Sequence, residues 1–85
     1  MIKALTIDEL FEMNSGKFNL TDREMQIALY WIKDYSYQEI GKQLGISPNT
    51  VKSHLSRINI KLQVNSKASL ILKIIEMGSQ HHAGV

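Results

Sequence analysis

Apolar residues recur at intervals of three and four along most of the chain, and no alternating apolar and polar run of useful length appears. The first pattern has the period of an α-helix that buries one face, whereas the second would indicate a β-strand. The chain is therefore expected to be all-α. Five short helices are predicted, near residues 7–14, 22–34, 37–44, 48–62 and 66–77.

Polar residues mark where these helices start. In a Ser/Thr-x-x-Glu capping box, the hydroxyl oxygen accepts from a backbone N–H three residues on, and the carboxylate accepts from the capping residue's own N–H. This pattern occurs at Thr6–Glu9, Thr21–Glu24 and Ser36–Glu39. Ser47 before Pro48 marks a fourth start, and Ser66 (or Asn65) a fifth.

Glycine often follows the last residue of a helix because it adopts a left-handed backbone without strain. The predicted ends are therefore Gly16, Gly45 and Gly78.

The predicted helix 48–62 has an apolar face and a polar face. At about 100° per residue, its apolar residues fall within a stripe roughly 60° wide, which is expected to be buried. These residues are Val51, Leu55, Ile58 and Leu62. The opposite face carries Asn49, Lys52, Ser53, Ser56 and Arg57, flanked by Thr50 and Lys61, and the helix has no acidic residue.

Short hydrogen-bonding side chains beside long cations suit the base edges and phosphates of a DNA groove. An ordinary solvated surface helix is the competing interpretation. The short preceding helix and the turn containing Gly45 favour DNA binding, because two helices joined in this way form a helix-turn-helix with an exposed second helix.

Two predicted helices carry more apolar surface than a lone small domain needs. Helix 22–34 has a second stripe at Met25, Leu29 and Ile32, and an N-terminal helix is expected to cover it with Leu5, Ile7, Leu10 and Phe11. Helix 66–77 has one stripe at Ala68, Ile71, Leu72 and Ile75, and another at Leu70, Ile74 and Met77. The second is assigned to a dimer interface, since exposed apolar stripes mark contacts. The alternative is that both stripes are buried within one chain.

Composition limits the other classes of function. The 85 residues suffice for one domain and include no cysteine, so disulfides and thiolate metal sites are excluded. No signal peptide or membrane span is apparent, and a cytoplasmic location is expected. Residues 1–40 carry four basic and seven acidic side chains, whereas residues 41–85 carry six basic and one acidic. A polyanion such as a nucleic acid is therefore expected to bind the second half of the chain.

No nucleophile–base pair, glycine-rich phosphate loop or cluster of carboxylates is evident, so no catalytic residue, metal or cofactor is expected. His81 and His82 have no partnering ligands nearby in the sequence, which makes a metal site there unexpected.

A series of residues at fixed spacing runs through segment 20–70: Leu20, Thr21, Arg23, Glu24, Glu39, Ile40, Leu44, Gly45, Ile46, Ser47, Thr50, Val51, Lys52, His54, Ile58, Lys61, Leu62, Val64 and Ser66. In this series the segment closely resembles the LuxR-type (GerE-type) helix-turn-helix of bacterial transcription regulators. So many matches over most of the chain form a specific signal.

The resemblance implies a four-helix DNA-binding domain, which is expected at residues 19–78. The residue pattern itself predicts an N-terminal helical extension (1–18) before this domain and a flexible tail (79–85) after it. Its fourth helix often mediates dimers. Carried over by position, the base contacts fall on Lys52, Ser53 and Ser56. The phosphate contacts fall on or near Ser36, Tyr37, Ser47, Asn49, Thr50, Arg57 and Lys61, partly because helix N-termini favour anions.

Three positions depart from the usual pattern of this family. Asp34 stands where Gly is usual, Gly41 where Ala is usual, and Lys67 where Arg is usual. Lys cannot reproduce a bidentate Arg pair, so an ion pair from Lys67 to Glu24 is left open.

The expected function is sequence-specific binding of double-stranded DNA by a transcription regulator that has no receiver or ligand-sensing domain of its own and acts as a homodimer. One alternative is a promoter-reading module like the fourth region of sigma factors, although the predicted last helix favours the LuxR type. Another is a protein that heterodimerises with a full-length regulator and inhibits it. Other regulators and RNA polymerase are possible partners, and a membrane is not.

Overall fold

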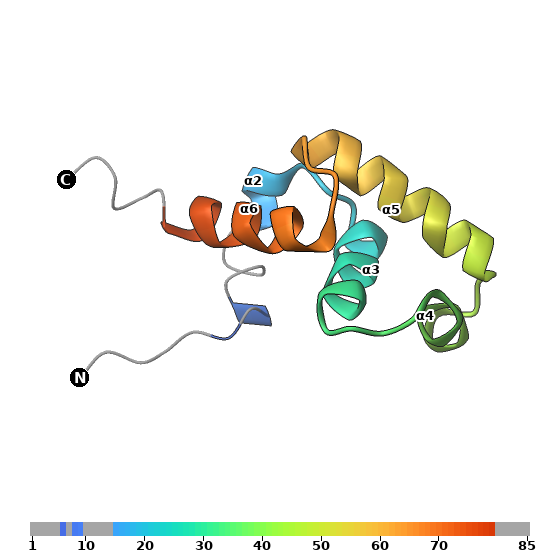
Figure 1. The fold of residues 1–85 in the computed structure, drawn as a ribbon. Coiled ribbons are helices and arrows are strands. Elements are labelled where there is room, and N and C mark those ends of the chain that lie inside the picture. The colour runs from blue at the N-terminus through green and yellow to red at the C-terminus, as the bar shows by residue number, and fades with distance from the viewer. Residues whose placement is uncertain (1–5, 7, 10–14, 80–85) are drawn as a thin grey trace.

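The computed structural model describes residues 6, 8–9 and 15–79, with only the backbone described at residues 15 and 77–79. This part of the chain contains helices and no strands (Figure 1). The helices are α2 (Ser15–Phe18), α3 (Asp22–Ile32), α4 (Tyr37–Leu44), α5 (Pro48–Leu62) and α6 (Lys67–Ser79). The all-α prediction is confirmed, and α4 and α5 have the predicted bounds. Most of the predicted helix 7–14 lies outside the described residues.

The predicted capping residues start the helices. At α3, the Thr21 amide donates to Glu24 Oε1 at 2.9 Å and the Glu24 amide donates to Thr21 Oγ1 at 3.1 Å. Thr6 with Glu9 and Ser36 with Glu39 form the same box. At the start of α6, the hydroxyls of Ser66 and Ser69 take both roles, each accepting from the other's amide at 3.0 Å.

A residue with a left-handed backbone follows four of the described helices: Asn19 (φ 53°) after α2, Asp34 (φ 73°) after α3, Gly45 (φ 68°) after α4 and Gln63 (φ 57°) after α5. After α3, α4 and α5 a backbone N–H reaches back five residues, as in Tyr35 N to Tyr30 O at 3.0 Å, which is the Schellman arrangement. Gly45 therefore ends α4 as predicted. The predicted ends at Gly16 and Gly78 are wrong, since these residues lie within α2 and α6.

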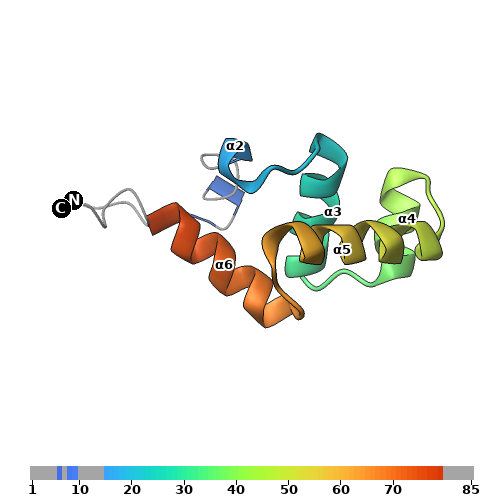
Figure 2. The same cartoon turned by 90° about the horizontal axis from the view of Figure 1, so that it is seen from above.

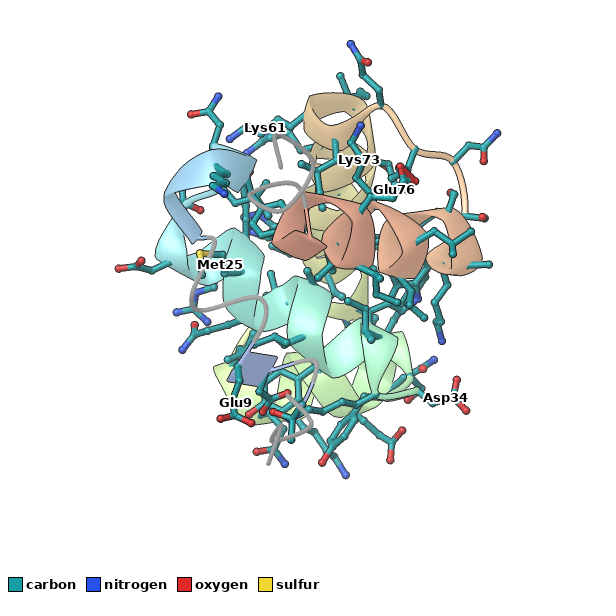
Figure 3. All side chains as sticks on the ribbon, turned by 90° about the vertical axis from the view of Figure 1, so that its left-hand side faces the viewer. Glu9, Met25, Asp34, Lys61, Lys73 and Glu76 are labelled. Atoms are coloured by element: carbon teal, nitrogen blue, oxygen red, sulfur yellow. The ribbon has the colours of Figure 1, made fainter. Side chains whose placement is uncertain are left out.

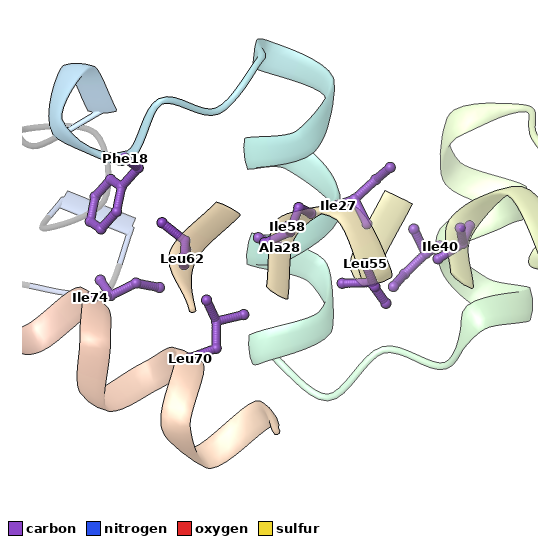
Figure 4. Packing of buried hydrophobic residues seen from close by; sticks show 10 residues of the cluster. Phe18, Ile27, Ala28, Ile40, Leu55, Ile58, Leu62, Leu70 and Ile74 are labelled. Atoms are coloured by element: carbon purple, nitrogen blue, oxygen red, sulfur yellow. The ribbon is translucent and has the colours of Figure 1, made fainter. Parts of the chain in front are cut away.

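The core lies between α3, α5 and α6 and continues to α4 at one end and α2 at the other (Figure 4). From above, α5 lies over α3 and extends toward α4 (Figure 2). The predicted stripe of α5 is confirmed, because Val51, Leu55, Ile58 and Leu62 are at most 4% exposed. Phe18 of α2, which was not predicted as a core residue, is 1% exposed.

The two stripes of α6 face opposite to their predicted directions. Leu70 and Ile74, assigned to a dimer interface, are fully buried and point toward the core residues of α5 and α2 (Figure 4). The stripe expected to be internal is partly outside instead, with Leu72 59% and Ile75 43% exposed. The side chain of Met77 is outside the described part. The assignment of Leu70 and Ile74 to a subunit interface is therefore wrong.

The outer stripe of α3 is half-buried at Met25, Leu29 and Ile32. Lys33 Nζ lies 2.7 Å from Asp8 Oδ2, so the described part of the N-terminal segment contacts α3. A groove of about 220 Å³ on this helix is lined by Gln26, Leu29, Tyr30 and Lys33. The residues predicted to cover the stripe, Leu5, Ile7, Leu10 and Phe11, lie outside the described residues, so the covering helix stays a prediction.

Candidate nucleic-acid interface

Helix α5 is held by its apolar stripe and presents its polar face to solvent. Ser47 caps its N-terminus, since Ser47 Oγ accepts from the Thr50 amide at 3.1 Å, and Pro48 occupies the first turn, where the amide it lacks would have no acceptor. All the residues predicted for the outer face are exposed: Asn49, Thr50, Lys52, Ser53, Ser56 and Arg57. The buried residues and the exposed polar residues of α5 therefore lie on opposite faces of the helix, as expected.

Lys52 and Arg57 have no acidic partner in the part of the chain that the structure describes. The two cations are therefore available to an external anion, with Ser53 and Ser56 beside them on the same helix. One residue in this region was missed by the sequence reasoning: Ile60 is 76% exposed near the C-terminal end of α5. It lies seven positions after Ser53, close to two helical turns, and so on the same side of the helix.

The turn between α4 and α5 is tight. The Ile46 amide donates to Gly41 O at 3.0 Å. A Cβ placed on Gly41 would lie 2.5 Å from Ile46 O, a backbone atom that cannot move without shifting the turn. Gly41 therefore lets the turn approach α4 more closely than an alanine would, and this fixes how α5 leaves the domain.

Replacing Gly41 with alanine should destabilise the domain although alanine favours helix. The gain in helix propensity is about 1 kcal/mol, and the steric cost of overpacking is about 1–3 kcal/mol. We expect a net loss of about 1 kcal/mol in the free energy of unfolding, measured with urea. Gly16→Ala is the matched control, because Gly16 is helical and, beyond its chain neighbours and its own helix backbone, no atom of the described residues lies within 4 Å of an added Cβ. Equal effects at the two sites would contradict the steric explanation.

The N-terminus of α4 opens this helix-turn-helix and the N-terminus of α5 follows its turn, and the capping hydroxyls at both are already engaged. Ser36 Oγ accepts from the Glu39 amide at 3.1 Å, and Ser47 Oγ lies 2.9 Å from Thr50 Oγ1. The Ser36 amide and hydroxyl hold the Glu39 carboxylate, which lowers its pKa. A phosphate at these ends would therefore meet the remaining backbone amides of the first turn, together with the exposed Thr50 and half-buried Tyr37.

Lys61 has a structural partner. Its Nζ lies 2.8 Å from Oε1 of Glu24, a carboxylate that is 3% exposed and also caps α3. Figure 3 shows Lys61 beside the end of α5, near α2. Burial alone would raise the pKa of Glu24, but the hydrogen bonds from Lys61 and Thr21 outweigh it and lower the pKa. Lys61 therefore already pairs with a carboxylate of its own domain, and its predicted contact with phosphate stays a prediction.

Of two further positions of the family pattern, Arg23 makes a contact between helices and His54 is partly buried. Arg23 Nη1 donates to Leu44 O at 3.4 Å and so joins α3 to the end of α4. His54 is half-buried on α5, and its Nδ1 has no hydrogen-bond partner within the described residues. Sequence position alone did not separate such structural residues from those that face outward.

Residues 6, 8–9 and 15–79 bring together no group of three or more His, Cys, Asp and Glu side chains that could hold a metal ion. His81 and His82 lie outside this part. None of the helices in the same residues is long and apolar enough to cross a membrane.

This fold and surface define a helix-turn-helix domain with an exposed, acid-free second helix. The family described as bacterial regulatory proteins, luxR family, matches residues 18–74. The chain belongs to this family, as the sequence resemblance indicated, and it is a DNA-binding transcription-regulator domain. The match includes most of α6, which favours this family over the sigma-like alternative.

Relatives named response regulator protein VraR occur in Staphylococcus aureus (strain NCTC 8325 / PS 47), Staphylococcus saprophyticus and Staphylococcus epidermidis. Each is 42% identical to this chain over 64 residues, which cover 75% of this chain and 28% of the relative. The matched segment is thus less than a third of these relatives' length. No solved structure matches the chain significantly.

Proposed function

We propose that this domain regulates transcription by placing α5 in the major groove of specific DNA sites. In this arrangement Lys52, Ser53 and Ser56 contact base edges. The observation that carries the proposal is the outer face of α5, where two cations without acidic partners among the described residues lie beside two exposed serines on a helix anchored by four buried residues. A helix held in this way can enter a groove without disturbing the core.

Phosphate contacts in the proposed complex surround this face. Asn49, Thr50 and Arg57 supply exposed side chains from α5. Backbone amides of the first turns, near Ser36 and Tyr37 of α4 and near Ser47 of α5, supply donors where the helix dipoles favour negative charge. These contacts would set the orientation of α5, and the base contacts would set the sequence preference.

The direct test is to select bound sequences from a pool of random DNA with the purified protein and to measure affinity at increasing salt. A shared motif should emerge, and affinity should fall steeply with salt, because each neutralised phosphate contributes about −0.9 to the logarithmic slope. Recovery of no enriched motif would contradict sequence-specific binding. Affinity that ignores salt would contradict contacts to the phosphates.

We further propose that the domain binds two half-sites as a homodimer through the outer side of α6. Leu72 and Ile75 lie three positions apart, about one helical turn, and form an exposed apolar strip. A symmetric pair of domains would place its two α5 helices on half-sites about one turn of DNA apart. The same strip would suit a related regulator, so a heterodimer is the competing arrangement.

Replacing Leu72 with glutamate should remove this pairing without affecting the core. Affinity for DNA with two half-sites should fall about tenfold or more, equivalent to about 1.4 kcal/mol, while affinity for a single half-site should fall only by the small amount that one added negative charge causes. Glu76→Gln on the same helix is the control, since Glu76 is also exposed. If Leu72→Glu bound both probes as the unaltered protein does, the homodimer proposal would be wrong.

The prediction that the regulator works without a receiver or ligand-sensing domain stays a prediction. The relatives named as response regulators are considerably longer than the matched segment. Contacts with RNA polymerase or with another regulator also stay predictions.

A further inference from the structure

Two carboxylates lie near the start of α4, where a DNA phosphate is proposed to bind. The first belongs to Glu39, which is held by Ser36. The second belongs to Asp34, two positions before Ser36, whose side chain is 91% exposed. Figure 3 shows Asp34 extending outward at the end of α3. The negative charge of Asp34 repels the Glu39 carboxylate and so raises its pKa, against the larger lowering effect of Ser36. An uncompensated Asp34 would therefore repel a phosphate approaching this end of α4.

Lys67 lies against Asp34. Its Nζ is 2.8 Å from Asp34 Oδ1 and 5.4 Å from the centroid of the Trp31 ring. The side chain of Lys67 is 32% exposed, so contacts on two sides hold the ammonium in place. The ring face attracts a cation, and the carboxylate fixes its direction.

The location of Lys67 within α6 is otherwise unfavourable. It is the first residue of this helix, where the helix dipole disfavours a positive charge. Asp34 also occupies a left-handed backbone position that glycine would adopt with less strain. Each residue is thus placed at some cost to its own helix end, and the contact between them accounts for both placements.

We propose that Lys67 is a positioning residue for DNA binding, which compensates the charge of Asp34 so that the start of α4 can approach a phosphate. The inference rests on the proposed function. It assigns to Lys67 an action through Asp34 rather than a contact with DNA. Two other roles for Lys67 are distinguishable from this one: a purely mechanical link between α6 and the α3–α4 loop, and a direct contact with phosphate.

The experiment uses Lys67→Gln, Asp34→Asn and the double variant, each checked for folding by circular dichroism. Affinity is measured by fluorescence anisotropy on a mixed-sequence duplex about two helical turns long. The salt concentration is about 50 mM, where electrostatic effects reach beyond 10 Å. Mixed-sequence DNA reports phosphate contacts without requiring a known operator.

Lys67→Gln should weaken binding about threefold, the size of one exposed charge interaction. Asp34→Asn should bind as tightly as the unaltered protein or more tightly, and the double variant should match Asp34→Asn. Because any charge change alters binding to a polyanion, Glu76→Gln and Lys73→Gln on α6 serve as controls for net charge. Charge compensation requires that the cost of Lys67→Gln disappear when Asp34 is neutral.

Three outcomes would overturn the proposal. If Asp34→Asn alone weakened binding as much as Lys67→Gln, the contact would be a mechanical link. If the double variant were as weak as Lys67→Gln, relative to the net-charge controls, Lys67 would contact DNA itself. If the unaltered protein bound no DNA, the proposed function would fail and this inference with it, whereas the first two outcomes leave DNA binding intact.

Discussion

Replacing Glu24 with alanine is expected to lower the free energy of unfolding by about 3 kcal/mol, which lies between the loss of a helix cap alone and the loss of a buried ion pair. The carboxylate accepts from the Thr21 amide at 2.9 Å and from Lys61 Nζ at 2.8 Å while only 3% of the residue is exposed. Removing it leaves two donors without an acceptor and a small cavity between α3 and α5. Urea denaturation would measure the loss.

Glu39→Ala is the matched control for this prediction. Glu39 forms the same capping box with Ser36, but it is exposed and has no lysine partner among the described residues. Its replacement should cost about 1 kcal/mol, the usual value of a cap. The difference between the two variants then measures the ion pair with Lys61 together with the burial of the Glu24 side chain. Equal losses would show that this pair adds nothing to the cap.

Stability should also depend on pH through Glu24. The pKa of Glu24 in the folded protein lies below its ordinary value of 4.5. A lowered pKa means that the stabilising contribution is complete above the unfolded value and disappears as pH falls through the folded value. The protein should therefore lose stability as pH falls below about 4.5. Glu24→Gln should lose less over the same range, as measured by thermal unfolding at stepped pH.

The second large effect is expected on DNA. Lys52→Ala should weaken binding to the selected sequence by about 5- to 150-fold, since a base-specific contact contributes about 1–3 kcal/mol. Binding to a scrambled sequence should change much less. Lys52 is exposed on α5, so its replacement should leave thermal stability unchanged. Competition binding with the two duplexes would measure the ratio.

Arg57→Ala provides the contrast. Arg57 is equally exposed on α5 but is proposed to contact phosphate, so its loss should weaken both sequences alike and reduce the salt slope by about 1. If Lys52→Ala also weakened both duplexes equally, Lys52 would be a phosphate contact. In that case the sequence preference of the domain would have to come from other residues of α5.

Local signals in the sequence predicted α5 well, because a capped start, a single apolar stripe and an acid-free opposite face all agree. The same reasoning assigned the buried and the exposed stripe of α6 the wrong way round. That helix has two apolar stripes with helical spacing, and periodicity cannot decide which of them meets the core. The decision depends on residues distant in sequence, since Leu70 and Ile74 pack in one cluster with Leu62 and Phe18.

Local sequence patterns likewise could not predict which charged residues form the long-range ion pairs. The resemblance raised an ion pair between Lys67 and Glu24, but the structure pairs Glu24 with Lys61 and Lys67 with Asp34. The partners are 37 and 33 positions apart, respectively. No helical period relates residues at such separations, so only the packing of α3 against α5 and α6 determines which charges meet.

The contact between Glu24 and Lys61 joins the first turn of α3 to the last turn of α5, with all of α4 between them. The intervening segment is therefore a loop whose two ends are held together by an ion pair. A chain whose ends are held together has less conformational entropy to gain when part of it opens. Partial opening of the helix-turn-helix is thus disfavoured relative to unfolding of the whole, and the surface offered to DNA is exposed in one arrangement rather than many.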